Sequence, residues 1–180
     1  VPLWFAPEGV KDSFSWRRSS DFEQVGKEAR AVRSSVGLSE ISGFAKYSVT
    51  GTGARAWLDG ILACRIPDQG RMTLAPMLKH DGKLIGDFTL ANQAFPFMAI
   101  SWMDIGMAPA LVGRVSYTGD LGYEIWCRPE YQRYLFDVLM DAGAAHSIAL
   151  FGSRALNALR LEKGFGSWAR EYRPIYGPYE

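Results

Sequence analysis

Residues 71–90 read RMTLAPMLKHDGKLIGDFTL, and they contain the clearest local structure in the sequence. Two strand-like runs, 71–79 and 84–90, flank a polar segment that contains Asp81 and Gly82. Asp-Gly between two such runs favours a type I′ turn and therefore an antiparallel hairpin. With these two residues as the turn, the predicted cross-strand pairs are Leu74 with Thr89, Pro76 with Asp87 and Leu78 with Ile85. All six side chains are then expected on one face of the hairpin, because alternate residues of a strand point to the same side.

The rest of the chain alternates predicted helices with predicted strands. Ser20 and Glu23 match a capping box at the start of a helical pattern over residues 21–35. Thr52 can cap a second helix, with Trp57 on the face that we expect to be buried. Further strands are expected at 44–50 and 148–151, a second hairpin from 110–117 and 123–127, and helices at 128–143 and 152–165. Antiparallel hairpins that alternate with packed helices indicate the α+β fold class.

The composition is typical of a soluble globular protein. Hydrophobic residues make up 48% of the 180 residues, charged residues 22%, and the formal charge is +1. Basic residues are spread along the chain, which does not favour a nucleic-acid-binding or membrane-surface protein. We expect no membrane span and no signal peptide, because the apolar runs are short and the N-terminus lacks a basic start. Cys64 and Cys127 are too few for a disulfide framework and lack metal-site spacing, so they predict reduced thiols and a cytoplasmic location.

Asp87 is the first candidate for chemistry. Aspartate is disfavoured in the middle of a strand, and the predicted register puts Asp87 on a face with Leu74 and Leu78. A carboxylate beside apolar neighbours costs several kcal/mol unless it is paired, so such groups often have a function. An exposed strand position or a structural ion pair would explain the same residue, and the sequence leaves both alternatives open.

Tyr117 and Glu124 flank the loop of the second predicted hairpin, where we expect them to lie opposite each other. A tyrosine and a glutamate in that arrangement could hold the edge of a heterocycle, with the carboxylate accepting from ring N–H groups. A purely structural role for both residues, at the ends of two strands, is an equally good interpretation.

Other patterns favour structural roles. Residues 51–56 match the G-x-G-x-x-A pattern of dinucleotide sites, but an antiparallel hairpin follows where a second parallel strand is needed. Arg160 and Glu162 are expected in a solvated charge cluster on the last helix. His80 and His146 lack partners at a useful spacing, so we predict no metal ligand and no catalytic triad.

Four ordered segments resemble the glycine-cleavage T-protein (aminomethyltransferase) family. Residues 33–42 (RSSVGLSEIS) are similar to the family's R-x-x-V-G-L-x-D-I-S segment, and 70–90 to its G-R-x-x-L-T-P-M-L-N-x-x-G-x-I-x-D stretch. Residues 117–125 (YTGDLGYEI) resemble Y-T-G-E-x-G-Y-E-I. Residues 159–163 (LRLEK) with Trp168 resemble the L-R-x-E-K-x-F-x-x-W motif of the sarcosine and dimethylglycine dehydrogenase branch. In that branch, Leu3-Trp4-Phe5-Ala6-Pro7 resembles the point where a folate-binding half follows a flavin half.

The resemblance implies roles for five residues. Asp87 matches an aspartate that assists transfer of the one-carbon unit. Leu74 and Thr89 match positions that line the pocket. Tyr117 and Glu124 match folate contacts, with the glutamate at the pterin.

The function implied by the resemblance is tetrahydrofolate-dependent transfer of an aminomethyl or methylene unit. The partners would be folate and a small methylated amine or another amine-derived donor. FAD would belong only to an N-terminal half that this chain does not contain. A binding module that holds folate without transferring carbon, and a remnant without function, are the two alternatives.

The sequence departs from the family pattern in ways that lead us to expect a fragment. Gly86 precedes Asp87 where the family has two adjacent aspartates, and a long stretch of the family is missing near Asn92 and Gln93. We expect a first lobe from residues 1–50 with 95–180, and a partial second lobe from 51–92. The incomplete lobe would have an open sheet edge, which predicts either an interruption between Asn92 and Gln93 or an oligomer that pairs through that edge.

Overall fold

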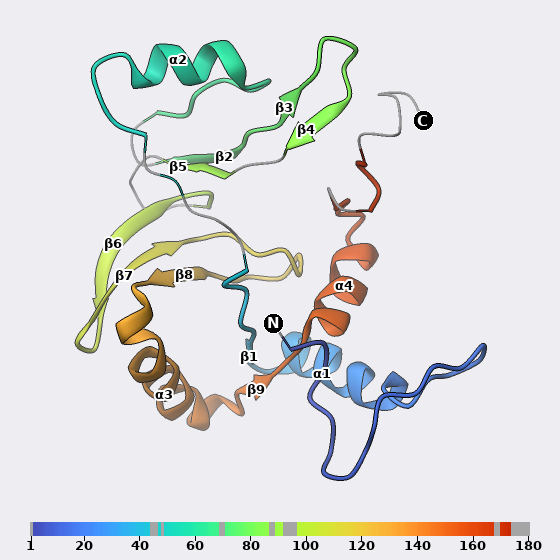
Figure 1. Ribbon diagram of the computed structural model, residues 1–180. Helices are drawn as coiled ribbons and strands as arrows, with labels where there is room; N and C mark the ends of the chain where they lie inside the picture. Colours follow the sequence, from blue (N-terminus) through green and yellow to red (C-terminus); the bar gives the residue numbers. More distant parts are fainter. Residues whose placement is uncertain are drawn as a thin grey trace.

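The computed structural model of the chain describes residues 2–43, 47, 49–68, 71–86, 89–91, 97–167 and 170–173. At residues 74, 84–86 and 89–91 it describes the backbone alone. Helices and antiparallel strands alternate along the chain (Figure 1), so the predicted α+β class is confirmed. Over the described ranges, no helix combines the length and the apolar character that crossing a bilayer requires.

Segments far apart in the sequence form one layer. It consists of α1 (Phe22–Ser34), β1 (Gly37–Leu38), β9 (Ala149–Leu150) and α4 (Ser153–Glu162). Strands β1 and β9 pair in parallel, and helices α1 and α4 pack against each other. Figure 1 shows the blue N-terminal elements beside the orange and red elements. The apolar residues Phe151, Ala155 and Leu159 are buried in this layer.

Glu28 is the polar centre of this layer. Its side chain is buried, although a buried carboxylate is costly without partners. Oε1 accepts a hydrogen bond from the backbone N–H of Phe5 at 2.8 Å, and Oε2 accepts one from Gly152 at 2.9 Å. Gly152 is the residue before α4, where the positive end of the helix dipole favours a negative charge. Glu28 therefore joins the N-terminal segment, α1 and α4.

A three-stranded antiparallel sheet forms the second layer. Its strands are β6 (Ile100–Ile105), β7 (Ala108–Gly113) and β8 (Glu124–Cys127), in that spatial order. The 3-10 turn η1 (Pro129–Tyr131) leads from β8 into α3 (Gln132–Gly143), and η2 (Ala144–His146) follows. Alternate residues of β7 are fully buried, which identifies its core face: Ala108, Ala110 and Val112. The predicted helix at 128–143 is confirmed, whereas the sequence analysis did not predict β6.

The third part is α2 (Ala54–Ile61) with the hairpin strands β2 (Met72–Leu74), β3 (Met77–Leu78), β4 (Leu84–Gly86) and β5 (Thr89–Ala91). Strands β2 and β5 pair antiparallel with Leu74 opposite Thr89, as the hairpin register predicts. Strands β3 and β4 pair with Met77 opposite Gly86. The hairpin predicted from residues 71–90 is therefore confirmed.

The turn of this hairpin differs from the prediction. The N–H of Gly82 donates to the carbonyl of Lys79 at 2.9 Å, and the N–H of Lys79 donates to Lys83 at 2.8 Å. Gly82 has φ +80°, whereas φ of Asp81 is not positive. A type I turn closed by a glycine in the left-handed region makes a three-residue loop, so the predicted type I′ turn is wrong. The extra loop residue moves Leu78 opposite Leu84 instead of Ile85, and a bulge between Met77 and Leu78 restores the register.

The second and third parts meet at Met98, which has φ +60°. The N–H of Met72 donates to the carbonyl of Met98 at 2.7 Å, and the N–H of Met98 donates to Arg114 at 3.1 Å. The N–H of Arg114 donates to Ala99 at 2.8 Å, which continues the β6–β7 ladder. Strand β2 is thereby attached to the end of the three-stranded sheet.

Two further predictions of local structure are wrong. Helix α1 occupies the predicted range, but Ser20 does not cap it, because its hydroxyl donates to the carbonyl of Lys11 and accepts from the N–H of Ser13. Helix α2 buries none of its residues, and Trp57 is 58% exposed instead of buried as predicted; Figure 1 shows α2 at the edge of the molecule.

Other predictions lie outside the described residues. They are the strand at 44–50 over most of its length, the partner of Pro76 at Asp87, and the interruption between Asn92 and Gln93. The boundaries of the two predicted lobes stay a prediction.

Candidate functional site

The hairpin brings two of the five predicted site residues together. Leu74 ends β2, Thr89 begins β5, and the two are opposite each other in the ladder. This backbone register is the one that the sequence predicts for the two residues. Asp87, the predicted catalytic residue, lies outside the described residues, and so do its contacts.

Glu124 lies on the sheet that adjoins this hairpin. It begins β8 opposite Gly113, and strand alternation puts Trp126 on the same face. A Cβ atom on Gly113 would come within 2.9 Å of the ring of Trp126 and 3.4 Å of the terminal methyl carbon of Met72. The side chain of Met72, from β2, therefore covers the sheet face that carries the half-buried Glu124. The structure thus brings the Glu124 face next to the strand that ends at Leu74.

Tyr117 is not opposite Glu124, so that prediction is wrong. The β7–β8 ladder ends at the pair Gly113–Glu124, and Tyr117 lies in the long loop between the strands. Within this loop, the hydroxyls of Ser116 and Thr118 lie 2.7 Å apart, and Thr118 Oγ1 accepts from the N–H of Asp120. Short polar side chains that bond to nearby backbone compete with strand pairing. The loop is therefore wider than the pattern of the sequence predicts.

Tyr117 instead contacts the segment after α4. Its hydroxyl donates to the carbonyl of Gly166 at 2.5 Å, and its ring stacks on Phe165 with centroids 6.2 Å apart and planes 20° apart. Burial raises the pKa of the Tyr117 phenol, and the nearby Arg160 guanidinium opposes this effect. The phenol is therefore a neutral donor at physiological pH.

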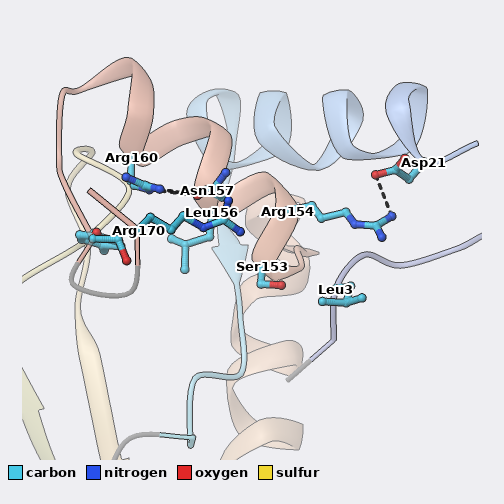
Figure 2. A pocket seen from close by; sticks show the side chains of 10 residues that line it. Leu3, Asp21, Ser153, Arg154, Leu156, Asn157, Arg160 and Arg170 are labelled. Carbon is cyan, nitrogen blue, oxygen red and sulfur yellow. Dashed lines mark hydrogen bonds and ion pairs between the residues drawn. The ribbon is translucent and has the colours of Figure 1, made fainter. Parts of the chain in front are cut away.

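Tyr117 lines a pocket of about 430 Å³ together with residues from α4 and from the segments beside it. Figure 2 shows Arg154 and Ser153 at the start of α4, and Asn157 and Arg160 further along the helix. The full lining is Leu3, Asp21, Tyr117, Ser153, Arg154, Leu156, Asn157, Arg160, Ser167 and Arg170. Glu124 is not among these residues, so the described residues do not form one continuous site.

Arg160 corrects the expectation of a solvated charge cluster on the last helix. The residue is 1% exposed, and its guanidinium donates to Asn157 Oδ1 and to the carbonyl of Phe165. Its Nη1 also lies 2.7 Å from Glu171 Oε2. This ion pair and the N–H of Ser167 lower the pKa of Glu171 to about 2. Glu162 does belong to an exposed ion pair, with Arg33.

The sequence contains a signal for the burial of Arg160. Arg160 is one helical turn after Leu156, an apolar residue of the predicted helix at 152–165, and residues four apart share a helix face. A charged residue on the inward stripe of a helix is an indication of a buried ion pair.

Arg154 forms the other wall of the pocket. Its guanidinium makes two hydrogen bonds to Asp12, at 3.0 and 2.7 Å, and lies 2.9 Å from Asp21 Oδ2. The Arg154 guanidinium holds the pKa of the Asp12 carboxyl below its usual range, and a hydrogen bond from Ser19 has the largest effect in lowering the pKa of Asp21. Two of the three arginines at the pocket are thus paired with carboxylates.

The arrangement offers a stacked aromatic ring and several donors around a cavity. Such a site can hold a flat heterocycle or an anionic group. In the part of the chain that the structure describes, no three histidine, cysteine, aspartate or glutamate residues gather as a metal site. Cys64 and Cys127 are free thiols.

Comparison with known proteins matches one family over the whole chain. The family described as "GCVT N-terminal domain" matches residues 1–92 and 89–180. Mitochondrial dimethylglycine dehydrogenase of Mus musculus is 27% identical over 247 residues, which cover 99% of this chain and 28% of that protein. The chain therefore spans less than a third of the length of this relative.

Two further relatives are a sarcosine dehydrogenase and an aminomethyltransferase. Mitochondrial sarcosine dehydrogenase of Homo sapiens is 33% identical over 99 residues, which cover 52% of this chain and 10% of that protein. Aminomethyltransferase of Bacillus subtilis is 22% identical over 233 residues, which cover 94% of this chain and 64% of that protein. The aligned lengths of 247 and 233 exceed the 180 residues of the chain. The aligned regions of these two relatives therefore contain residues with no counterpart here.

Proposed function

Because the chain belongs to the family of the GCVT N-terminal domain, we propose that it is a tetrahydrofolate-dependent one-carbon transfer domain of a dimethylglycine or sarcosine dehydrogenase-like protein. Its substrates would be folate and a one-carbon unit from a small methylated amine. The relatives named dimethylglycine dehydrogenase support this choice of donor, because they align with 99% of the chain. The cytoplasmic location stays a prediction, since several relatives carry the word mitochondrial in their names.

The observation that carries the proposal is the pairing of Leu74 with Thr89. The family resemblance assigns both positions to the folate pocket, and the sequence pattern independently predicts that they face each other. Strand β2 also adjoins the sheet face of Glu124, through the side chain of Met72. Three of the expected folate contacts therefore belong to neighbouring strands.

The described residues fit a folate in chemical type. A pterin needs an aromatic or apolar wall and hydrogen-bonding groups, and the ring of Tyr117 provides such a wall beside Phe165. The pocket of about 430 Å³ beside Tyr117, which Leu74, Thr89 and Glu124 do not line, is within the range of roughly 300–1,000 Å³ that small-molecule sites occupy. Arg170 on its rim is a donor suited to a carboxylate.

Each predicted residue has a stated task in this proposal. Leu74 and Thr89, which are not among the residues that line the pocket beside Tyr117, would contact the ligand from the hairpin. Glu124 accepts hydrogen bonds from ring N–H groups of the pterin, because an ionised carboxylate only accepts. Tyr117 presents the face of its ring, since its hydroxyl is already donated to Gly166.

The chemical step depends on position and charge. Tetrahydrofolate would supply the amine nitrogen that takes up the one-carbon unit, after the FAD-containing half expected in a longer protein has oxidised the donor amine by two electrons to an iminium. Asp87 would hold or remove a proton at that nitrogen, or stabilise positive charge that develops beside it. Fixing the two reactants side by side would supply much of the remaining rate.

The test uses the protein at the full length that its gene encodes. Tetrahydrofolate binding is measured by calorimetry, and methylene-tetrahydrofolate is measured with sarcosine or dimethylglycine as the donor. Binding together with product supports the proposal. Binding without product favours a module that only holds folate, and the absence of binding favours a remnant; either result overturns the transferase proposal.

A further inference from the structure

Two aromatic side chains lie in solvent on the loop of residues 13–20, here named the aromatic loop. Phe14 is 83% exposed and Trp16 is 94% exposed, and their rings meet edge to face with centroids 5.5 Å apart. Figure 1 shows this dark blue segment extending beyond the start of α1. Adjacent exposed aromatic side chains indicate an interaction site, and tryptophan is a frequent anchor of protein interfaces.

The aromatic loop is closed at its base by its own hydrogen bonds. The N–H of Ser20 donates to the carbonyl of Ser13 at 3.4 Å, and the N–H of Ser13 donates to Ser20 Oγ at 2.9 Å. Ser20 Oγ donates in turn to the carbonyl of Lys11 at 3.1 Å. Nearer the tip, the N–H of Arg17 donates to Ser15 Oγ at 3.2 Å. The loop therefore has a defined shape before it binds, which lowers the entropic cost of an interaction.

Arg154 fixes both ends of the aromatic loop to the start of α4. Its guanidinium lies 2.7 Å from Asp12 and 2.9 Å from Asp21, the residues on either side of the loop. The backbone N–H of Arg154 also donates to the carbonyl of Leu3 at 2.9 Å. Figure 2 shows Leu3, Arg154 and Asp21 together. The first residues of the chain and the base of the loop therefore lie within the length of one arginine side chain.

A domain that precedes residue 1 in a longer protein would emerge beside this loop. The relative named dimethylglycine dehydrogenase aligns with 99% of this chain over only 28% of its own length, so most of that protein lies outside the aligned region. A covalent connection keeps such a domain at an effective concentration on the order of millimolar. A small contact area is then enough for docking.

A second copy of this chain fits the loop less well. Phenylalanine and tryptophan bury about 150–250 Å² each. Two such loops together therefore bring less than the roughly 1,200 Å² that a stable interface between separate chains needs. The contact area favours a partner that is already attached to the chain.

We propose that the aromatic loop docks on the domain that precedes residue 1 in the full-length protein, with Phe14 and Trp16 inserted into an apolar pocket of that domain. The inference rests on the proposed function in one respect, that the chain belongs to a longer dehydrogenase-like protein. Arg17 follows Trp16 and is exposed, so it suits an acidic rim of that pocket. The contact sets the orientation of the two domains, and it needs no ligand in the pocket beside Tyr117.

Photo-crosslinking in the full-length protein tests this contact directly. Trp16→p-benzoylphenylalanine keeps an aromatic side chain at the tip and forms a covalent bond with a neighbouring C–H group under ultraviolet light. After digestion, mass spectrometry should find residues 12–17 linked to a region upstream of residue 1 in the same chain. A mixture of ¹⁴N- and ¹⁵N-labelled protein separates links within a chain from links between copies.

Several outcomes of this experiment would overturn the inference. They are links between copies, links confined to residues 1–180, the absence of any link, and a gene that encodes no domain before residue 1.

A second measurement, of cleavage by trypsin after Arg17 and Arg18, needs no artificial side chain. Docking shields this site, so the rate of cleavage follows the population of undocked loop. The double variant Phe14→Ser/Trp16→Ser should be cleaved at least about tenfold faster than the wild type, because it lacks both anchors. The control Met107→Ser, at a side chain that is 77% exposed between β6 and β7, should change the rate less than about twofold. Equal rates in the double variant and the wild type would contradict docking.

Neither measurement contains folate or an amine donor. Docking can therefore be found in a protein that forms no methylene-tetrahydrofolate, and it can be absent from a protein that does. The inference and the proposed function are thus overturned by different results.

Discussion

At the scale of single residues, Tyr117 and Glu124 show why neighbours in a motif can have different surroundings. Glu124 is in a strand that pairs with Gly113, whereas Tyr117 is in a loop and contacts Phe165 and Gly166 after α4. The carboxylate faces the part of the molecule that contains β2, and the phenol faces the pocket beside α4. Substitutions at the two positions should therefore have separable effects.

The first prediction concerns Asp87. Asp87→Asn in the full-length protein should lower methylene-tetrahydrofolate formation by at least about 100-fold, since the amide cannot take a proton or supply charge. Folate affinity should fall much less, because the amide keeps the size of the side chain. Product formation is measured by single-turnover kinetics and affinity by calorimetry. Unchanged turnover would mean that Asp87 has a structural role and no catalytic one.

The second prediction concerns Glu124. Glu124→Ala should weaken folate binding by about ten- to a hundredfold, the effect of losing a hydrogen bond to a charged group. The melting temperature of Glu124→Ala should stay close to that of the wild type. Glu130→Ala is the control, because Glu130 is an exposed acidic residue that follows the same strand. Equal folate affinity in a folded Glu124→Ala variant would contradict the pterin contact.

At the scale of elements, contacts at the two ends of α4 connect it to segments that are distant in the sequence. The start of α4 contacts Glu28 and contains Arg154, which pairs with Asp21; its end contacts Phe165, Glu171 and the loop of Tyr117. The ion pair of Arg160 with Glu171 responds to acid, because Glu171 must stay ionised to form it.

The third prediction is a pH dependence. The pKa of Glu171 is lowered from 4.5 to about 2 in the folded protein. A depressed carboxyl pKa stabilises the fold above the unfolded value, and this contribution is lost as pH falls toward the folded value. The stability difference between wild type and Glu171→Gln should therefore be constant above about pH 5 and should shrink between about pH 4.5 and 2. Thermal melts across this range measure it, and a difference that persists undiminished at pH 2 would contradict the assignment.

The elements that the sequence predicted best are those with a clear period or turn. The hairpin pairing of Leu74 with Thr89 followed from alternation, because each face of a strand repeats every second residue. Strand β6 escaped prediction because Trp102, Met103 and Asp104 are all exposed, so neither face shows an apolar pattern. The turn at Gly82 was assigned wrongly because Asp-Gly fits both a two-residue loop and a three-residue loop.

The candidate site was predictable only in part, because local patterns do not reveal contacts between distant segments. The hairpin residues follow from local register, but the contacts of Tyr117 with Phe165 and Gly166 join segments that no local pattern relates. Arg160 was assigned to solvent because charged residues usually are exposed. Its burial depends on Glu171, which lies in a segment without periodicity.

At the scale of the whole molecule, the layer of α1, β1, β9 and α4 depends on contacts across most of the sequence. Glu28 is the polar group at its centre, and it satisfies two backbone donors from distant segments. Apolar packing holds this layer as well, but it lacks the direction that two hydrogen bonds impose.

The fourth prediction tests this centre. Glu28→Ala should lower the free energy of unfolding by on the order of 3 kcal/mol, because it leaves the buried N–H of Gly152 and the half-buried N–H of Phe5 without acceptors. Glu23→Ala, an exposed change on the same helix, should cost less than about 0.5 kcal/mol. Urea unfolding of the two variants provides the comparison, and similar values for both would contradict the central role of Glu28.

The bond between Glu28 and Gly152 also sets an order of events during synthesis. The two residues are 124 positions apart, and a ribosome adds about 5–20 residues per second. Helix α1 therefore leaves the ribosome roughly 6–25 s before the backbone that satisfies Glu28 exists. During that interval the apolar face of α1 has no partner from α4, and a nascent chain in this condition is a substrate for chaperones. The layer that contains α1 and α4 thus cannot assemble before α4 has been synthesised.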